Sequence, residues 1–235
     1  MGILEVEGIH TFYGLSHILF GISLQLEAGE TVCLLGRNGA GKTTTLRSIM
    51  GLTPARSGKV IFQGQDITKT PAYLIAQRGI GFIPEDRRIF GNLTVRANLD
   101  VAAKPSGSGL VKWTLDRVYA LFPILKEREL QHGGSLSGGE QQMLTIARSL
   151  MGNPQVLLID EPMEGLSPLI VQMLGEQIIR LQKEGLTNMV VEQYSDFIVG
   201  ISSRAYILEK GIIRYSGTAQ SLKEDEDTKR KYLGV

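Results

Sequence analysis

Residues 31–44 read Thr-Val-Cys-Leu-Leu-Gly-Arg-Asn-Gly-Ala-Gly-Lys-Thr-Thr, and this stretch decides the fold. An apolar run ends at Leu35, the pattern GxxxxGK[ST] occupies residues 36–43, and a helix-like segment follows. Glycines in this pattern let successive backbone N–H groups close around phosphate oxygens at a helix N-terminus, where the helix dipole already favours an anion. The stretch therefore predicts a phosphate-binding loop between a strand and a helix, and with it the binding of a nucleoside triphosphate.

Two residues of this loop carry the most specific expectations. Lys42 is expected to reach the β- and γ-phosphates, and the hydroxyl of Thr43 to bind Mg²⁺. A glycine-rich turn without a ligand is the alternative, and the strand-like run before the loop and the helical segment after it make that alternative less favourable. The candidate nucleotide-binding residues here are Gly36, Asn38, Gly39, Ala40, Gly41, Lys42, Thr43 and Thr44.

The composition is that of an ordinary globular protein. The 235 residues are 43% hydrophobic and 21% charged, which suits one large domain, so we expect residues 1–235 to form a single one. With 25 basic and 24 acidic residues the net charge is +1, so beyond a small local patch there is no basic field of the kind that nucleic-acid binding needs. Cys33 is the only cysteine, which excludes disulfides and cysteine-based metal sites within the chain.

The beginning of the chain does not resemble a targeting signal. Met-Gly-Ile-Leu-Glu-Val-Glu has no basic segment followed by an apolar core. No apolar run approaches membrane-spanning length. We therefore expect a cytosolic or peripheral protein.

The hydrophobic pattern predicts two kinds of β structure. Residues 3–35 read as short strands separated by Gly14, Gly21 and Gly29, which is typical of an antiparallel β layer. After the loop, strands alternate with helices and are apolar on both faces, which favours a mostly parallel sheet covered on both sides. The expected later strands are 60–62, 80–83, 156–159, 188–191, 205–208 and 212–215. One expected helix follows the loop and ends at Met50, and three others span 73–77, 168–184 and 223–231.

A helical segment interrupts this alternation. Residues 92–153 have a helical pattern, broken by a Lys-Pro-Ser-Gly-Ser-Gly turn at 104–109 and by Gly133-Gly134. We interpret the region from approximately residue 86 to 153 as a helical subdomain. The expected fold class is therefore α/β, with a mostly parallel central sheet, an N-terminal antiparallel β layer and a helical subdomain.

Two acidic residues follow the apolar strand at 156–159. Asp160 is expected on the metal side of the site, holding Mg²⁺. Glu161 comes directly after it and is placed to polarise a water molecule for in-line attack on the γ-phosphorus. A strand that simply ends in ordinary acids is the alternative, and the phosphate-binding loop in the same chain argues against it.

The segment Leu136-Ser-Gly-Gly-Glu-Gln opens the last helix of the subdomain. Ser137 and Glu140 form the S-x-x-E capping box, and capping alone would be a sufficient reason for both residues. Gly138 and Gly139 would cost about 1 kcal/mol each relative to alanine inside a helix, unless backbone must approach another group closely. A phosphate is the expected group.

Taken in order, the loop, this glycine segment and the strand ending Asp-Glu-Pro resemble an ABC-type ATPase domain of the P-loop NTPase class. The resemblance covers essentially the whole chain. It implies ATP and Mg²⁺ as cofactors, and two such domains paired head-to-tail. Ser137 and Gly139 of one subunit would then reach the γ-phosphate held by Lys42 of the other, with Gly138 and Glu140 beside them.

Four further positions follow from this resemblance. Tyr13 stands where an aromatic ring stacks on adenine, although a tyrosine at a sheet surface is the plain alternative. Glu85 stands where the family usually has a glutamine that touches Mg²⁺ and senses the membrane subunit. Gln193 replaces the usual histidine against the γ-phosphate, and Ser167 replaces an aspartate. These departures leave the family roles of Glu85, Ser167 and Gln193 open.

Several segments narrow the resemblance to importers. Residues 82–90, 164–168, 191–194 and 232–235 are similar to the second ATPase subunit of branched-chain amino acid importers. Residues 122–128 and 191–197 are also similar to the ATPase of urea importers. The implied function is ATP hydrolysis that powers solute import. The alternatives are a urea or short-amide importer, a lipopolysaccharide-type exporter, or a soluble ABC protein that works on ribosomes or DNA.

The same resemblance implies partners and a location. The expected partners are two transmembrane permease subunits, a second ATPase subunit that is identical or related, and an external solute-binding receptor reached through the permeases. We expect the chain on the cytoplasmic face of the bacterial inner membrane, bound peripherally. Substrate choice would then lie with the receptor and the permeases.

Overall fold

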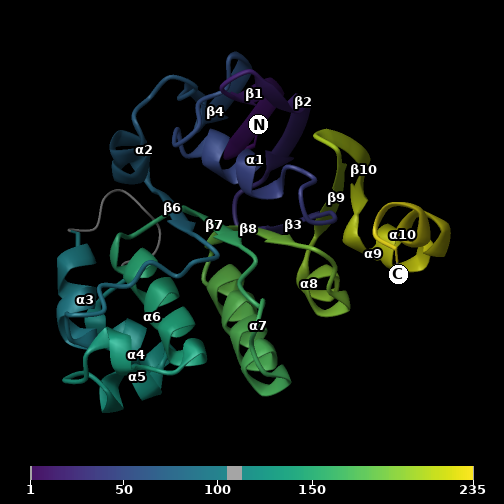
Figure 1. The fold of residues 1–235 in the computed structure, drawn as a ribbon. Helices are drawn as coiled ribbons and strands as arrows, with labels where there is room; N and C mark the ends of the chain where they lie inside the picture. The colour runs from purple at the N-terminus through teal and green to yellow at the C-terminus, as the bar shows by residue number, and fades with distance from the viewer. Residues whose placement is uncertain (1, 105–112, 235) are drawn as a thin grey trace.

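The computed structural model describes residues 2–104 and 113–234, which form two sheets with helices around them (Figure 1). The central sheet has the strand order β10-β9-β3-β8-β7-β6. Its neighbouring strands are parallel except at one edge, where β10 runs antiparallel to β9. Its strands are β3 (Thr31–Leu35), β6 (Ile80–Ile83), β7 (Val156–Asp160), β8 (Thr187–Glu192), β9 (Arg204–Glu209) and β10 (Ile212–Thr218). The mostly parallel sheet expected from the sequence is confirmed.

The register of the central sheet brings distant segments together at the carboxyl ends of its parallel strands. Leu35, at the end of β3, pairs with Glu192 in β8. Asp160, at the end of β7, pairs with Val191 in β8. Because parallel strands end on the same side, the loop after β3 and the acidic residues after β7 leave the sheet together, which is where α/β sheets bind ligands.

The second sheet is antiparallel, as expected, with the order β2-β1-β4-β5. Its first strands are longer than the short runs that we predicted, because Gly21, which we expected between strands, lies inside β2, as Gly8 lies inside β1. Both glycines have positive φ, and the pairing of β1 with β2 shifts register near each. Such bulges bend a strand without ending it. The strands are β1 (Leu4–Tyr13), β2 (Ser16–Leu26), β4 (Ser57–Phe62) and β5 (Gln65–Asp66).

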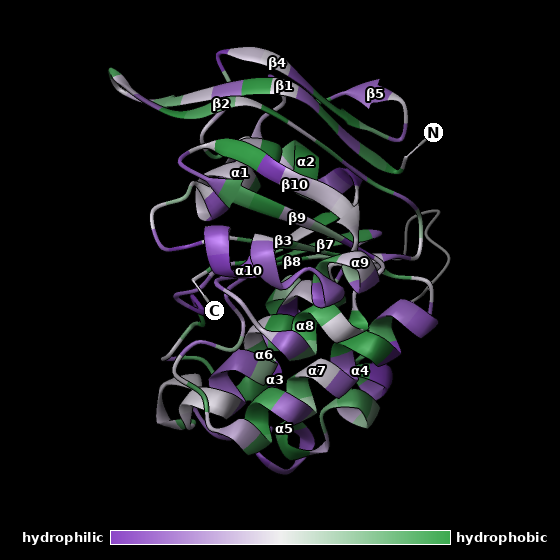
Figure 2. Cartoon of the chain, turned by 90° about the vertical axis from the view of Figure 1, so that its right-hand side faces the viewer, coloured by the Kyte–Doolittle hydropathy of each residue, from purple (hydrophilic) through white to green (hydrophobic). Residues whose placement is uncertain are grey.

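Two apolar clusters cover opposite faces of the central sheet (Figure 2). Alternate residues of one strand enter different clusters: Leu34 faces the antiparallel sheet, and Leu35 faces the helices. Between the two sheets lies α1 (Lys42–Ile49), whose Leu46 is fully buried. The helix that follows the phosphate-binding loop is thus held in place by apolar packing between the two sheets.

Helix α2 (Ala72–Arg78) joins the same apolar cluster as α1 through Ile75, and the remaining helices cover the other face and the ends of the molecule. Helices occupy the described part of the predicted helical segment, and Gly133–Ser135 forms a 3₁₀ turn where we expected a break. Of the turn predicted at 104–109, residues 105–109 lie outside the described residues. The helices are α2 (Ala72–Arg78), α3 (Val95–Ala102), α4 (Leu115–Leu121), α5 (Pro123–Glu127), α6 (Gly138–Met151), α7 (Pro168–Lys183), α8 (Asp196–Ile201), α9 (Ala219–Glu224) and α10 (Glu226–Tyr232). None of the helices in the described ranges is long and apolar enough to cross a membrane.

The end of the chain departs from the single solvated helix that we predicted at 223–231. The helix is interrupted at Asp225. The Asp225 carboxylate accepts a hydrogen bond from the Thr228 N–H and so caps the start of α10. Lys229, in α10, is buried and its ammonium group donates to the Lys223 carbonyl. A local capping interaction and a buried lysine, neither visible in the charge pattern, explain the difference.

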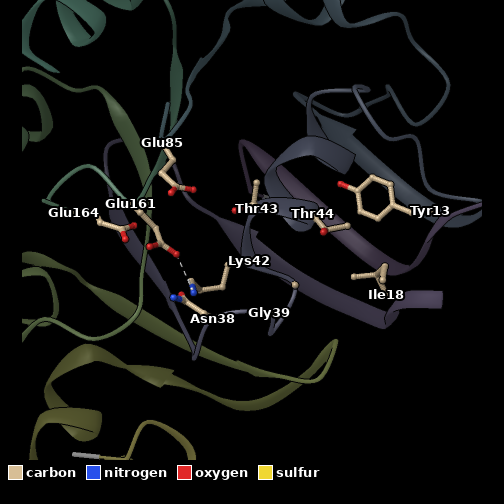
Figure 3. Close-up of a pocket in the computed structure, with 11 residues that line it drawn as sticks. Tyr13, Ile18, Asn38, Gly39, Lys42, Thr43, Thr44, Glu85, Glu161 and Glu164 are labelled. Carbon is tan, nitrogen blue, oxygen red and sulfur yellow. Dashed lines mark ion pairs between the residues drawn. The ribbon is translucent and has the colours of Figure 1, made fainter. Parts of the chain in front are cut away.

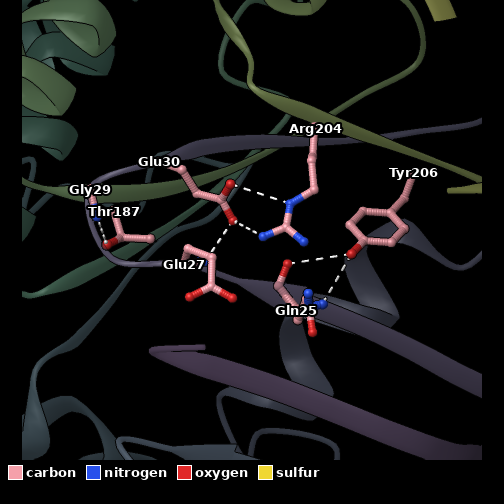
Figure 4. A network of polar contacts seen from close by, with 7 residues as sticks. All are labelled: Gln25, Glu27, Gly29, Glu30, Thr187, Arg204 and Tyr206. Carbon is pink, nitrogen blue, oxygen red and sulfur yellow. Dashed lines mark hydrogen bonds and ion pairs between the residues drawn. The ribbon is translucent and has the colours of Figure 1, made fainter. Parts of the chain in front are cut away.

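A polar network ties the two sheets together beside the start of β3 (Figure 4). The Arg204 guanidinium group on β9 donates to both carboxylate oxygens of Glu30, at 2.6 and 3.3 Å. The Glu27 N–H also donates to Glu30, at 2.6 Å, and the Tyr206 hydroxyl bonds to the backbone of Gln25. The turn that joins the antiparallel sheet to β3 is therefore anchored on the central sheet.

Candidate nucleotide-binding site

The predicted phosphate-binding loop spans the gap between β3 and α1, as the sequence indicated. Two of its glycines have no room for a side chain. A Cβ atom on Gly36 would lie 2.3 Å from the Leu208 carbonyl oxygen, and one on Gly41 would lie 2.8 Å from the Leu19 side chain. Gly41 also has φ 110°, and it directly precedes the helix at Lys42. These glycines let the loop pass close to the neighbouring strands and turn sharply into α1.

Lys42 is held across its own loop. It is only 4% exposed, and its Nζ donates to the carbonyl oxygens of Gly36 at 2.8 Å and Arg37 at 3.3 Å. The same nitrogen forms an ion pair with Glu161 Oε1 at 3.1 Å. The lysine from one motif and the glutamate from the other therefore meet at one point.

The second acidic residue faces the start of α1. Thr43 Oγ1 donates to Asp160 Oδ1 at 3.1 Å. Burial, together with the charges of Glu161 and Glu85, raises the pKa of Asp160 to about 6. A cation at this point would therefore stabilise the ionised carboxylate.

These oxygen groups fit Mg²⁺, which is usually held by one or two carboxylates together with phosphate oxygens. The Thr43 hydroxyl and the Asp160 carboxylate are the groups in contact, and Glu85 lines the adjoining cavity. No three His, Cys, Asp or Glu side chains in the described part of the chain gather into a metal site of their own. The protein thus supplies only part of the oxygen ligands that Mg²⁺ needs, and phosphate oxygens of a bound nucleotide would supply others.

A cavity of about 420 Å³ extends from these residues to the hairpin between β1 and β2 (Figure 3). Tyr13, which is 46% exposed, and Ile18 line its hairpin end. Glu85, Glu161 and Glu164 line the opposite end. The other lining residues are Asn38, Gly39, Gly41, Lys42, Thr43 and Thr44.

Nine of the predicted site residues thus line one cavity, and the others lie elsewhere. The nine are Tyr13, Asn38, Gly39, Gly41, Lys42, Thr43, Thr44, Glu85 and Glu161. Gln193 is exposed and outside the cavity, and its backbone carbonyl accepts from the Gly36 N–H at 3.2 Å. Gly36 and Ala40 belong to the loop but do not line the cavity. Asp160 does not line it either, but accepts a hydrogen bond from Thr43, which does.

Glu161 has an unusual backbone. Its φ is 43°, a left-handed conformation that costs a residue other than glycine on the order of 1–3 kcal/mol. Its N–H donates to the Val191 carbonyl at 2.9 Å, which helps to hold the turn. Such strain concentrates at functional positions in proteins.

The predicted glycine segment lies at the start of α6, outside the cavity. The capping box is present: Glu140 Oε2 accepts from the Ser137 N–H at 2.8 Å, and Ser137 Oγ accepts from the Glu140 N–H at 3.4 Å. A Cβ atom on Gly138 would lie 2.9 Å from the Arg87 guanidinium group, and one on Gly139 would lie 3.1 Å from Ile170. Contacts within the chain therefore already favour both glycines, in addition to the phosphate contact that we predicted.

Three residues of the site were missed by the sequence analysis. Ile18 reaches the cavity beside Tyr13 because the hairpin folds back on itself. Glu164 lies on the turn after Glu161, and a hydrogen bond to Glu161, together with the charge of that residue, raises the pKa of Glu164. Glu192 is buried at the end of β8. A glutamate directly after the apolar run 189–191 was the available signal for Glu192.

The residues 19–164, more than half of the chain, match the family model described as ABC transporter. The chain belongs to the ABC transporter family. The family predicted from the three motifs is thereby confirmed, and with it an ATPase that binds ATP.

Relatives that align with the whole chain include amino acid transport and lipopolysaccharide export ATP-binding proteins. The high-affinity branched-chain amino acid transport ATP-binding protein BraG of Pseudomonas aeruginosa is 39% identical over 232 residues, covering 99% of this chain and 100% of BraG. The probable branched-chain amino acid transport ATP-binding protein LivF of Archaeoglobus fulgidus is 35% identical, with 99% of each chain covered. The lipopolysaccharide export system ATP-binding protein LptB of Haemophilus influenzae is 36% identical, covering 100% of this chain and 98% of LptB.

Solved structures agree on the fold. A nucleotide-free ATP-binding cassette from an ABC transporter superposes with a TM-score of 0.86 at 25% identity, covering 100% of this chain and 99% of the other. The cbiO1 structure from Clostridium perfringens gives a TM-score of 0.80 at 25% identity, covering 98% and 94%. The chain is thus an ATP-binding subunit of the ABC transporter type.

Proposed function

We propose that this chain is the ATP-hydrolysing subunit of an importer for branched-chain or other hydrophobic amino acids. The observation that carries the catalytic part is the meeting of Lys42, Thr43, Asp160 and Glu161 at one edge of the sheet. The similarity to BraG and LivF over the full length supports the amino acid class. Residues 1–235 then act as one ATPase domain, with approximately 86–153 as its helical subdomain.

In the proposed mechanism the loop residues bind the triphosphate and Glu161 activates water. Lys42 exchanges its contact with Glu161 for the β- and γ-phosphates, and Thr43 and Asp160, with Glu85 nearby, would hold Mg²⁺. When bound, Mg²⁺ would neutralise charge on the phosphate oxygens. The Glu161 carboxylate, released from Lys42, accepts a proton from the attacking water, and the water oxygen bonds to the γ-phosphorus as the bridging oxygen leaves with ADP.

The two ends of the cavity suggest how the rest of ATP lies. The phosphates would occupy the loop end and the adenine the hairpin end, against Tyr13 and Ile18. Ser137, Gly138, Gly139 and Glu140 lie outside this cavity in the same chain, so we propose that they complete the site of a second ATPase subunit paired head-to-tail.

Gln193→Ala is expected to lower ATP turnover by about tenfold or less. The proposed role of Gln193 is one neutral hydrogen bond to the γ-phosphate, and losing such a bond typically costs about 0.5–1.5 kcal/mol. The substitution leaves the backbone contact from Gly36 to residue 193 in place. Turnover at saturating Mg-ATP in the assembled transporter checks this. A loss as deep as that of Glu161→Gln would make Gln193 an essential catalytic group.

A second groove, of about 270 Å³, supports the proposal that permease subunits are partners. Its lining combines apolar residues with three arginines, of which Arg88 already pairs with Asp86. Within the described residues, the buried Nε of Arg148 has no hydrogen-bond partner. We propose that a permease segment with an apolar side chain and a carboxylate docks here. The lining residues are Leu52, Phe82, Pro84, Arg87, Arg88, Ala102, Thr145, Arg148 and Ser149.

Leu52→Glu is expected to weaken association with the permeases about tenfold or more. Leu52 is 44% exposed on the groove, and burying a leucine side chain contributes about 1.5–3 kcal/mol, which corresponds to about that change in affinity. Copurification from solubilised membranes, together with ATP binding by the free subunit, measures the effect. Leu130→Glu is the matched control, because Leu130 is 80% exposed and lies outside the groove. Equal copurification of the two variants would refute docking at this groove.

The transport function is tested by purifying the subunit with its membrane partners and reconstituting them in vesicles. We expect two permeases and a second ATPase subunit to copurify, at the cytoplasmic face of a bacterial inner membrane, and an external receptor to deliver a branched-chain amino acid. ATP-dependent uptake of leucine supports the proposal, whereas uptake of urea supports the amide importer. Export of lipopolysaccharide, which the similarity to LptB favours, or copurification with ribosomes or DNA, would overturn it.

A further inference from the structure

Glu192 is a buried carboxylate that the proposed mechanism does not use. It ends β8, is 7% exposed, and lies at the sheet edge from which the phosphate-binding loop and the acidic turn depart. Within the described ranges it forms no ion pair, and its Oε1 accepts a hydrogen bond from the Met163 N–H at 3.2 Å. A carboxylate in such a place is unfavourable unless it makes a specific contact, and the contact that it makes is with the turn after Glu161.

That turn is held from β8 at both ends. The Glu161 N–H donates to the Val191 carbonyl, and the Met163 N–H donates to Glu192. Pro162 lies between them and has no N–H to contribute. The two backbone donors of this three-residue turn are therefore both satisfied by neighbouring residues of β8, and Glu161, at the first of these contacts, keeps its left-handed φ of 43°.

The contact with Met163 requires an acceptor oxygen on Glu192, which both the charged and the neutral carboxyl group provide. Burial, together with the charge of Glu161, raises the pKa of Glu192 to about 7, while the hydrogen bonds from the Met163 and Gln193 N–H groups and the charge of Lys42 act in the opposite direction. Neutral carboxyl groups are thus well populated near neutral pH, and a neutral carboxyl keeps an acceptor oxygen. An amide of the same length would make the same contact.

We propose that Glu192 is a positioning residue for ATP hydrolysis: its side-chain oxygen holds the Met163 N–H and so fixes the left-handed turn that directs Glu161 toward Lys42 and the nucleotide cavity. The inference rests on the proposed role of Glu161 as the residue that activates water. A small displacement of a catalytic group can cost about 10²-fold in rate, so the fixed turn matters for hydrolysis more than for ATP binding.

The test compares three substitutions at this position in the full-length chain. Glu192→Met removes the acceptor and is expected to lower kcat about tenfold or more with unchanged affinity for ATP. Glu192→Asp keeps the charge but withdraws the oxygen by one methylene, so we expect a similar loss. Glu192→Gln keeps the acceptor at the same distance, so we expect most of the wild-type kcat. If Glu192→Met does not fold, the comparison of kcat between Glu192→Asp and Glu192→Gln still tests the role of Glu192.

Two controls separate positioning from a general loss of stability. Asn188→Leu removes a buried polar side chain from the other end of β8, where it bonds to Thr31 Oγ1 and the Leu186 carbonyl. At a matched loss of Tm it should leave kcat near the wild-type value. In the Glu161→Gln background, Glu192→Met should cause no further loss, because a residue that acts through Glu161 has nothing left to position.

The outcomes distinguish this inference from the proposed function. Wild-type kcat in Glu192→Met, a Gln variant as slow as the Met variant, an equal loss in Asn188→Leu, or a multiplicative loss in the double variant would each overturn the role of Glu192. Wild-type turnover in Glu161→Gln would instead overturn the proposed catalytic residue itself.

Discussion

Glu161→Gln is expected to slow ATP hydrolysis by about 10²- to 10⁴-fold while leaving ATP binding intact. The amide has nearly the size of the carboxylate but cannot accept a proton from water. Lys42 loses its ion pair at 3.1 Å, so nothing in the change hinders its contact with phosphate. Single-turnover hydrolysis and equilibrium binding of labelled ATP measure the two quantities, and the variant should accumulate an ATP-bound dimer.

The matched control for this experiment is Glu176→Gln. Glu176 is exposed on α7 and does not line the cavity. Its substitution therefore makes the same change of a carboxylate to an amide, but away from the nucleotide site. Its turnover should equal that of the wild type. Hydrolysis by Glu161→Gln at the wild-type rate would show that another group activates the water.

Ser137→Arg is expected to abolish ATP-dependent dimerisation while each monomer still binds ATP through Lys42. Ser137 is exposed at the start of α6 and lies outside the cavity of its own chain, so a large side chain there does not obstruct that cavity. In the proposed dimer it faces the γ-phosphate of the other subunit, where an arginine does not fit. Light scattering with and without ATP, in the Glu161→Gln background that retains ATP, measures the pairing.

Loss of the helix cap must be separated from this effect. Ser137→Ala removes the same hydroxyl, which typically costs about 0.5–2 kcal/mol of stability, but adds no bulk. We expect the alanine variant to form dimers and the arginine variant to remain monomeric. Normal ATP-driven dimers in Ser137→Arg would refute the shared site.

The elements that the sequence predicted best are those with a sharp chemical boundary. The strand at 80–83 was predicted with both of its ends, because an apolar run stops at Pro84. The loop at 36–43 was predicted because its glycines and Lys42 form a pattern with one physical purpose. The length of β2 could not be predicted in this way, since Gly21 looks like a strand end but lies at a bulge.

The parts of the site that the sequence did not reveal depend on tertiary pairing. Ile18 joins Tyr13 only because of the hairpin register, and Glu192 joins the turn after Glu161 only because β8 lies beside β7. Neither contact is visible in the local sequence, although Glu192 itself stands out as an acidic residue after an apolar run. The side chain of Gln193, whose contact with the γ-phosphate is implied by the family resemblance, is exposed and does not line the cavity, so its role stays a prediction.

The contribution of the hairpin to the cavity bears on which nucleotides this ATPase would accept. At that end the lining residues are the aromatic ring of Tyr13 and the aliphatic side chain of Ile18. Discrimination between similar ligands is strong when buried polar groups read the edge of a base, and weak when a flat ring and a methyl-bearing chain provide only contact area. On the proposed placement, guanine would stack there almost as well as adenine. On this placement the protein itself would discriminate only weakly between ATP and GTP.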